Sequence, residues 1–221
     1  MSGRLILVRH GETEANVAHR LDTRVPGAPL TELGNRQARE AGERLATAPP
    51  LALISSVALR ARQTAAQIET ATGVSAEALD GIFEVQVGDL EDRSDKDSHE
   101  MFKQIYHRWH QGDLRARVPG GESGADVLDR FLPVIADLRG KYLGTESDGA
   151  VLMVSHAAAI RLVAAQLAPM PGEFAVNNHL GNTETVELIV GPDGRWTCVR
   201  WGRFTPPFAP DISPVPDNPI G

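Results

Sequence analysis

Short apolar runs alternate with amphipathic stretches along most of this chain. Continuous apolar runs at residues 4–9, 51–55 and 151–154 predict strands that are buried on both faces of a sheet. Apolar positions spaced by three and four residues predict helices between them. The predicted helices cover residues 31–46 with Thr31 as N-cap, 59–71 ended by Gly73, 97–110, a long stretch capped by Ser123, and 157–167.

This alternation of buried strands and helices predicts an α/β fold. We expect a three-layer sandwich in which a mainly parallel central sheet carries helices on both faces. Residues 184–190 and 196–201 alternate in polarity and are separated by Gly191-Pro192-Asp193-Gly194. They predict a hairpin at the edge of the sheet.

Composition places the chain among globular proteins of ordinary size. It has 221 residues, of which 42% are hydrophobic and 23% charged, and a formal net charge of −7. This charge argues against general binding to nucleic acids or anionic membranes. Cys198 is the only cysteine, so no internal disulfide is expected and a reduced cytoplasm is the predicted location. The apolar stretch Leu5–Val8 is too short for a signal peptide or a membrane span.

The first predicted strand ends in residues that suit phosphate chemistry. Arg9 offers a planar set of donors for phosphate, and His10 can act as a nucleophile or proton carrier near neutral pH. Gly11 allows the backbone to approach a ligand closely. Because strand ends in α/β sheets open onto the binding crevice, we interpret Arg9-His10-Gly11 as the centre of a phosphate site.

Five ordered motifs resemble the histidine phosphatase superfamily, the phosphoglycerate mutase-like enzymes of branch 1, over residues 4 to 190. The resemblance implies the phosphoglycerate mutase-like fold and a single domain over residues 1–203 with a cap insertion at about 92–120. The prolines of residues 204–221 predict an extended tail that is either draped on the domain or disordered. The motifs are Arg9-His10-Gly11-Glu12 with Asn16; Leu30–Gly34 with Gln37-Ala38 and Gly42; Ser55-Ser56 with Arg60–Ala65; Glu84 with Gly88, Leu90 and Glu91; and Gly120–Ser123 followed by Val154-Ser155-His156 and Ile160-Arg161. One departure is Val57-Ala58, where the family has Pro or Asp and then Leu.

The resemblance implies that His10 attacks phosphorus and forms a phosphohistidine. Arg9 and Arg60 are then expected to hold the phosphoryl oxygens, with His156 as a further donor on the phosphate. The phosphate-binding set also includes Ala157, which follows His156. Asn16 is expected either to donate its amide to a phosphoryl oxygen or to stabilise the turn.

Glu84 is the predicted general acid, which later acts as the base that activates water. The apolar neighbours Phe83, Val85 and Val87 would keep it partly desolvated and therefore protonated near the working pH. Three other carboxylates compete for this role: Glu12, Glu91 and Glu122. Arg62 lies two positions after Arg60 and should point to solvent from another face of the helix.

The amphipathic stretch 97–110 carries a second cluster of candidate residues. His99, His107 and His110 invite a metal site, but no carboxylate or further histidine completes zinc-like spacing, so we expect them on the solvated side of the helix. Tyr106, His107 and Arg108 could instead help to select substrate if the helix covers the pocket.

These residues predict a metal-independent phosphatase, without a cofactor, that acts on a small phosphate ester. A cofactor-dependent phosphoglycerate mutase is the first alternative, but the short segment between Glu84 and Gly120 lacks the basic, Pro-rich insertion usual in the family's mutases. A regulatory protein that binds phosphorylated ligands without catalysis is the second alternative. The final hairpin or the exposed face of 97–110 could support a homodimer.

Overall fold

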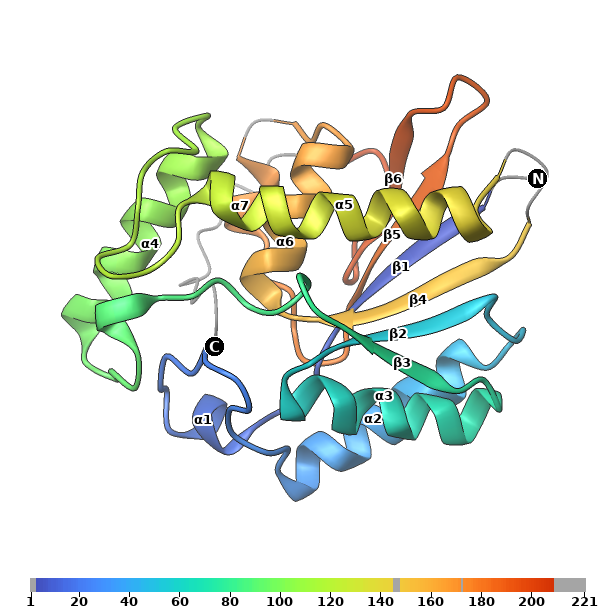
Figure 1. Cartoon of the computed structure of the whole chain (residues 1–221), viewed down its shortest axis with the longest axis horizontal. Coiled ribbons are helices and arrows are strands. Elements are labelled where there is room, and N and C mark those ends of the chain that lie inside the picture. Colours follow the sequence, from blue (N-terminus) through green and yellow to red (C-terminus); the bar gives the residue numbers. More distant parts are fainter. Residues whose placement is uncertain (1–2, 145–147, 172, 209–221) are drawn as a thin grey trace.

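A six-stranded sheet forms the centre of the molecule in a computed structural model that describes residues 3–144, 148–171 and 173–208 (Figure 1). The strands lie in the order β3-β2-β4-β1-β5-β6. Contacts among the first four are parallel, and β5 and β6 form the predicted antiparallel hairpin at one edge. The strands are β1 (Arg4–Arg9), β2 (Ala52–Ser56), β3 (Ala76–Leu79), β4 (Ala150–Ser155), β5 (Thr185–Val190) and β6 (Trp196–Trp201).

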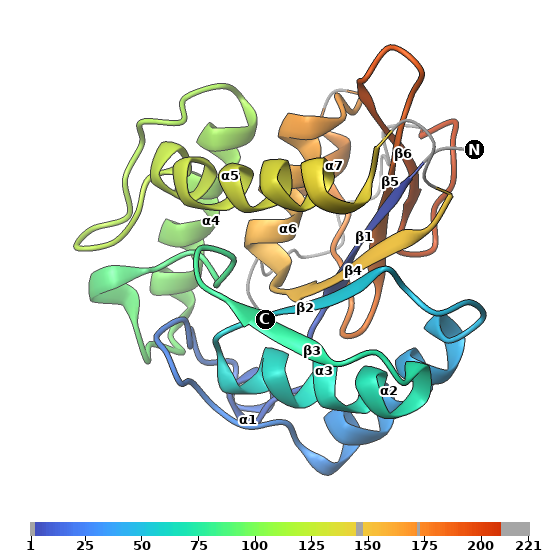
Figure 2. The ribbon, with the colours of Figure 1, turned by 45° about the vertical axis from the view of Figure 1, so that its right-hand side comes forward.

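Helices cover both faces of this sheet, as the sequence predicts. In Figures 1 and 2, α2 and α3 lie on one face, and α5, α6 and α7 lie on the other, with α4 beyond the carboxyl end of β4. The helices are α1 (Glu14–Val17), α2 (Glu32–Leu45), α3 (Leu59–Thr72), the 3₁₀ turn η1 (Gly88–Leu90), α4 (Lys96–His110), α5 (Gly124–Tyr142), α6 (Ala157–Leu167) and α7 (Phe174–Asn177). No helix among the described residues is both long and apolar enough to cross a membrane.

The continuous apolar run of β1 is explained by burial on both sides. Leu5 and Leu7 pack into the larger core beneath α5 and α6, whereas Ile6 and Val8 pack against α3 on the opposite face. All four side chains are less than one tenth exposed. The hydrophobic effect therefore fixes the position of this strand, and with it the position of the Arg9-His10 segment at its carboxyl end.

The predicted helix ends are confirmed. Thr31 and Ser123 accept hydrogen bonds from the backbone of Gly34 and Asp126, and Gly73 ends α3 with a left-handed φ of 72°. The second strand runs one residue later than predicted, over Ala52–Ser56. The edge strand β3 and the short helices α1 and α7 were not predicted, because they are four residues long and carry no recognisable apolar period.

The first residues of the predicted Pro-rich tail contact the body of the molecule. Phe204 forms an isolated bridge with Trp201, and the ring of Phe208 lies 5.0 Å from that of Phe174. The structure describes the predicted tail only as far as Phe208, and residues 209–221 lie outside the described residues.

Two glycines allow the segment after β1 to contact the start of α2. A Cβ atom added to Gly11 would lie 2.5 Å from the carbonyl oxygen of Gly34, and one added to Gly34 would lie 2.0 Å from that of Glu12. Both distances are shorter than real side chains tolerate. The two backbones can approach only because neither residue has a side chain.

Gly34→Ala is therefore expected to lower the free energy of unfolding by about 2–3 kcal/mol, because the new methyl group must displace backbone. Gly140→Ala in α5 is the matched control, since a Cβ there meets no atom within 4 Å. It should be neutral or raise stability by up to about 1 kcal/mol through helix propensity. Urea unfolding of both variants tests this, and equal stabilities would contradict the close approach.

Candidate active site

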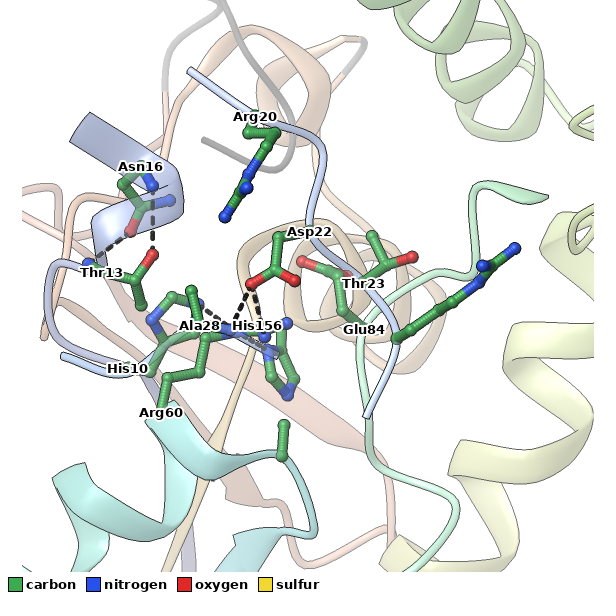
Figure 3. Close-up of polar contacts among 12 residues, drawn as sticks. His10, Thr13, Asn16, Arg20, Asp22, Thr23, Ala28, Arg60, Glu84 and His156 are labelled. Carbon is green, nitrogen blue, oxygen red and sulfur yellow. Dashed lines mark hydrogen bonds and ion pairs between the residues drawn. The ribbon is translucent and has the colours of Figure 1, made fainter. Parts of the chain in front are cut away.

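Two strand ends and one helix start bring the central residues together. Arg9 and Ser155 are register partners at the ends of the parallel strands β1 and β4, so the next residues, His10 and His156, lie side by side. Their ring centroids are 5.2 Å apart at an interplanar angle of 61°. Arg60, from the first turn of α3, reaches between them (Figure 3). The structure thus places three predicted site residues in direct contact.

The hydrogen bonds of His10 fix which nitrogen can attack. Its Nδ1 lies 2.7 Å from the carbonyl oxygen of Gly11, which can only accept, so Nδ1 carries the proton. Nε2 therefore keeps its lone pair and accepts from Nε of Arg60 at 3.1 Å. Burial and then the Arg60 charge lower the pKa of His10 well below its usual value. The imidazole is neutral, and its Nε2 is the nitrogen that carries an unprotonated lone pair.

His156 has the opposite tautomer. Its Nδ1 accepts from Nε of Arg60 at 3.2 Å, so its proton lies on Nε2, which donates to Oγ of Ser56 at 2.9 Å. Burial, followed by the charge of Arg60, lowers its pKa well below the usual value. The sequence motif contained Ser56, but it gave no indication that this hydroxyl orients the second histidine.

Arg60 contacts both histidines and the carboxylate of Asp22. Its side chain is 3% exposed, and its Nη1 lies 3.4 Å from Oδ2 of Asp22. Gly27, with a φ of 73°, leaves room for the guanidinium, because a Cβ there would lie 2.4 Å from Nη1. Arg62 is exposed, as predicted from its position on the helix. The buried member of this arginine pair is therefore Arg60.

Arg9 is also buried, at 1% exposure, but part of its hydrogen-bonding capacity is used by the protein. Its Nη1 donates to the carbonyl oxygen of Leu180 at 2.7 Å and lies 3.0 Å from Nε2 of His179. Desolvation lowers its pKa to about 10, which still leaves it charged. These contacts from the segment before β5 were not predicted and hold the guanidinium in place.

Glu84 is enclosed at the start of α6. Its Oε1 accepts from the backbone of Val85 at 2.8 Å and of Ala159 at 3.0 Å, and its Oε2 accepts from Ala158 at 3.2 Å. Burial nevertheless raises its pKa above the usual value, with these hydrogen bonds opposing the shift. The prediction of a desolvated carboxyl group agrees with this environment.

The three competing carboxylates each have another partner. Glu12 accepts from the hydroxyl of Thr31, Glu91 accepts from Thr23 and Arg24, and Glu122 forms an ion pair with Arg130. Glu122 also accepts from the backbone of Gln86, which is the bracing role expected of it. None of the three lines the pocket around His10. Glu84 is therefore the candidate acid that the geometry favours.

Asn16 stabilises the turn at the start of α1, which is one of the two roles expected of it, and it also lies at the pocket. Its Oδ1 accepts from the backbone of Thr13 in a capping box at the start of α1. It also lines the pocket. Ala157 is fully buried as the first residue of α6 and does not line the pocket.

The expectation for the histidines of α4 is wrong in part. His99, His107 and His110 are all partly buried rather than freely solvated, and the ring of His110 lies 4.7 Å from that of Tyr106. Tyr106 is fully buried and donates to the carbonyl oxygen of Ala158, so it does not contact substrate. Among the described residues, no group of three or more His, Cys, Asp or Glu is arranged to hold a metal ion.

The pocket itself is small and polar. It is partly open to solvent. Two charged residues that the sequence did not single out, Arg20 and Asp22, belong to its lining, because the loop after α1 folds back over the site. The lining residues are His10, Thr13, Ala15, Asn16, Arg20, Asp22, Arg60 and Glu84.

Comparison with known proteins adds independent information. The sequence model described as "Histidine phosphatase superfamily (branch 1)" matches residues 5–203. Glucosyl-3-phosphoglycerate phosphatase of Mycolicibacterium vanbaalenii is 30% identical over 207 residues, which cover 90% of this chain and 91% of that protein. A probable phosphoglycerate mutase of Salmonella paratyphi C is 28% identical over 195 residues, or 88% of each chain. The structure of mycobacterial glucosyl-3-phosphoglycerate phosphatase with inorganic phosphate superposes with a TM-score of 0.73 at 26% identity, covering 90% of this chain and 96% of that one.

Arg60→Ala is expected to weaken binding of inorganic phosphate by about 30-fold to 1,000-fold, because a buried charged donor is removed from the pocket. Arg62→Ala is the matched control from the same helix and should leave binding unchanged. Titration calorimetry with phosphate measures both affinities. Equal losses in the two variants would show that Arg60 has no special place in the site.

Proposed function

This chain belongs to the histidine phosphatase superfamily, branch 1, and we propose that it hydrolyses a small phosphate monoester through a phosphohistidine formed on His10. It is a phosphatase, in keeping with the phosphatases among its relatives. The observation that carries the proposed mechanism is the tautomer of His10. Its proton is held on Nδ1 by Gly11, and the lone pair of Nε2 faces the charged group of Arg60 at the pocket.

In the first half of the reaction, Nε2 of His10 attacks phosphorus. A P–N bond forms, the P–O bond to the leaving alcohol breaks, and the alkoxide takes the proton of Glu84. Arg60 and Arg9 stabilise the charge on the phosphoryl oxygens. His156 joins them once its proton moves from Nε2, where Ser56 accepts it, to Nδ1, which faces the centre of the site. When the phosphoryl group binds, Nε of Arg60 donates to a phosphoryl oxygen in place of the two imidazole nitrogens. The contacts made before substrate binds therefore hold the Arg60 guanidinium in place for the anion.

In the second half, the Glu84 carboxylate takes a proton from water. The resulting hydroxide attacks phosphorus, the P–N bond breaks, and inorganic phosphate leaves His10 neutral again. Glu84 returns to its protonated form, so in each cycle it gives one proton to the leaving alcohol and takes one from water. Every proton is carried by a side chain or water, so the proposed reaction requires no metal ion.

Phosphoglycerate mutase remains the alternative, because a probable mutase is among the relatives. A mutase needs its histidine phosphorylated by a bisphosphate before turnover can begin. Turnover of a simple monoester to inorganic phosphate without bisphosphoglycerate supports the phosphatase. Formation of 2-phosphoglycerate from 3-phosphoglycerate only after priming would support the mutase.

Four further expectations stay proposals. We propose that residues 92–120, which contain α4, form a cap that belongs to the same domain. We also propose that the protein acts in the cytoplasm as a phosphatase of soluble esters and binds neither nucleic acid nor membrane. Finally, we propose that it can form a homodimer. The single cysteine, Cys198, and the net charge of −7 support the cytoplasmic assignment and the absence of nucleic-acid binding.

The first test is hydrolysis of p-nitrophenyl phosphate in EDTA by the wild type and by His10→Ala. We expect full activity of the wild type in EDTA, because no step uses a metal ion, and loss of turnover by about 10⁴-fold or more in the variant. Release of nitrophenolate measured at 405 nm follows the reaction. Activity that disappears in EDTA would contradict a metal-free mechanism, and an active His10→Ala protein would exclude the proposed nucleophile.

Glu84→Gln tests the general acid. It should lower kcat for glycerol 3-phosphate by about 10²–10⁴-fold and lower the first-step rate for p-nitrophenyl phosphate much less, since nitrophenolate leaves without a proton. The raised pKa of Glu84 keeps it protonated to higher pH than a free glutamate, and wild-type kcat/KM should fall as pH rises through that pKa. The lowered pKa of His10 means that its protonation limits activity only at acid pH.

In Glu84→Gln the loss of activity on the basic side should disappear. Glu122→Gln is the control among the competing carboxylates and should keep the wild-type pH profile. Wild-type kcat for glycerol 3-phosphate in Glu84→Gln would mean that another group protonates the leaving oxygen.

A further inference from the structure

Asp22 is a carboxylate inside the phosphate pocket that the proposed mechanism does not use. Its side chain is 11% exposed and lines the same cavity as His10, Arg60 and Glu84. An anion in a site that binds an anion opposes the binding of phosphate unless it serves another purpose. Figure 3 shows its carboxylate directed toward Arg60, in the space bordered by Arg20 and Glu84.

Only one oxygen of this carboxylate is used by the protein. Oδ2 accepts from the backbone of Ala28 at 2.8 Å and lies 3.4 Å from Nη1 of Arg60. Within the part of the chain that the structure describes, Oδ1 accepts no hydrogen bond. A carboxylate oxygen in a polar pocket without an internal donor is available for a donor on a ligand.

The backbone on both sides of Asp22 is tied to the segment that follows Glu84. Leu21 exchanges backbone hydrogen bonds with Arg93 and Asp92, at 2.9 and 2.8 Å. The backbone of Thr23 donates to Glu91 at 2.8 Å. The backbone at Asp22 is therefore held beside the pocket by these bonds.

The position of Asp22 relative to Glu84 determines which part of a substrate it meets. The phosphoryl group must lie against Nε2 of His10 and the guanidinium of Arg60, and the leaving oxygen must lie toward Glu84 to receive its proton. Asp22 borders the same cavity, so the leaving alcohol lies within its reach. Because an ionised carboxylate only accepts hydrogen bonds, it attracts a hydroxyl or ammonium group there and repels a carboxylate.

Arg20 is the cation at this pocket that could attract an anionic leaving group instead. Its side chain is 41% exposed, and its Nε lies 3.8 Å from Oδ1 of Asp92. Solvent screens such an exposed charge, whereas the more deeply buried Asp22 acts through less water. Asp22 is therefore the anion of the pocket lining that is placed to contact the leaving group.

We propose that Asp22 determines specificity: its free Oδ1 selects phosphate monoesters whose leaving alcohol carries a hydroxyl or ammonium donor, and it disfavours those that carry a carboxylate. The preferred substrate class is thus a polyol or amino-alcohol phosphate. This inference rests on the phosphatase function proposed above. It adds a residue that contacts the substrate outside the phosphoryl group.

The test compares three esters of similar size: glycerol 3-phosphate, O-phosphoethanolamine and 3-phosphoglycerate. We expect wild-type kcat/KM to be about tenfold or more higher for the first two. In Asp22→Asn, which removes the charge at constant shape, the preference over 3-phosphoglycerate should fall about tenfold. A ratio of two substrates is the readout because any displacement of Arg60 lowers all three rates alike and leaves the ratio unchanged.

Asp97→Asn is the matched control. It removes the same charge from an exposed position in the first turn of α4, outside the pocket lining. The ratio should stay at the wild-type value. An equal shift in both variants would show that the overall charge at the mouth, and not contact with Asp22, sets the preference, and would overturn the proposal.

A wild-type enzyme that prefers 3-phosphoglycerate also overturns the proposal, and this outcome needs no variant to fold. An unchanged ratio in a folded, active Asp22→Asn protein overturns it as well. Turnover of p-nitrophenyl phosphate distinguishes a failure of the proposed phosphatase function from a failure of the specificity proposed for Asp22. If the wild type hydrolyses none of the four esters, both the proposed function and this inference are wrong. If it hydrolyses them without the expected preference, only the inference is wrong.

Discussion

The buried guanidinium of Arg60 is the constraint on which the rest of the site depends. Its Nε donates to both His10 and His156, and its Nη1 lies near the carboxylate of Asp22. A permanent cation at this place disfavours protonation of either histidine, so both rings stay neutral. Each ring then has one accepting nitrogen and one donating nitrogen. Gly11 and Ser56 bind the donating nitrogens and so decide which one faces the centre.

Burial acts in opposite directions on the acid and on the nucleophile. It lowers the pKa of His10 and raises that of Glu84, because in both cases the charged form is the one disfavoured. The result is a neutral imidazole and a carboxyl group that keeps its proton to higher pH than a free glutamate. This is the combination required by nucleophilic attack with proton donation to the leaving oxygen. The dry environment comes from the core beneath the sheet ends, so the packing that fixes β1 also sets the chemistry.

Much of this arrangement follows from the sequence. Apolar runs buried on both faces located β1 and β4, and parallel pairing then places His10 next to His156. Helix phase separated Arg60 from the exposed Arg62. The residues themselves indicated a phosphate site at Arg9-His10-Gly11, and the family resemblance implied the roles of His10, Arg60 and His156 in it.

Other features could not be predicted because they depend on contacts between distant segments. Asp22 and Arg20 lie in a loop without periodicity, and hydrogen bonds of Leu21 and Thr23 with the distant segment 91–93 hold that loop over the pocket. The burial of Tyr106 depends on how α4 packs against α6, where its hydroxyl meets Ala158. The short edge strand β3 is stabilised by its neighbour β2 and not by its own residues. Local pattern carries no information about such partners.

The measurement that tests the central claim most directly is the capture of the covalent intermediate. Wild-type enzyme mixed with substrate and quenched in alkali, where phosphohistidine survives, is digested and analysed by mass spectrometry. The account predicts one phosphoryl group on His10, bonded through Nε2, which is absent from His10→Ala. Substrate turnover with no phosphorylated enzyme at any time, or a phosphoryl group on another residue, would contradict it.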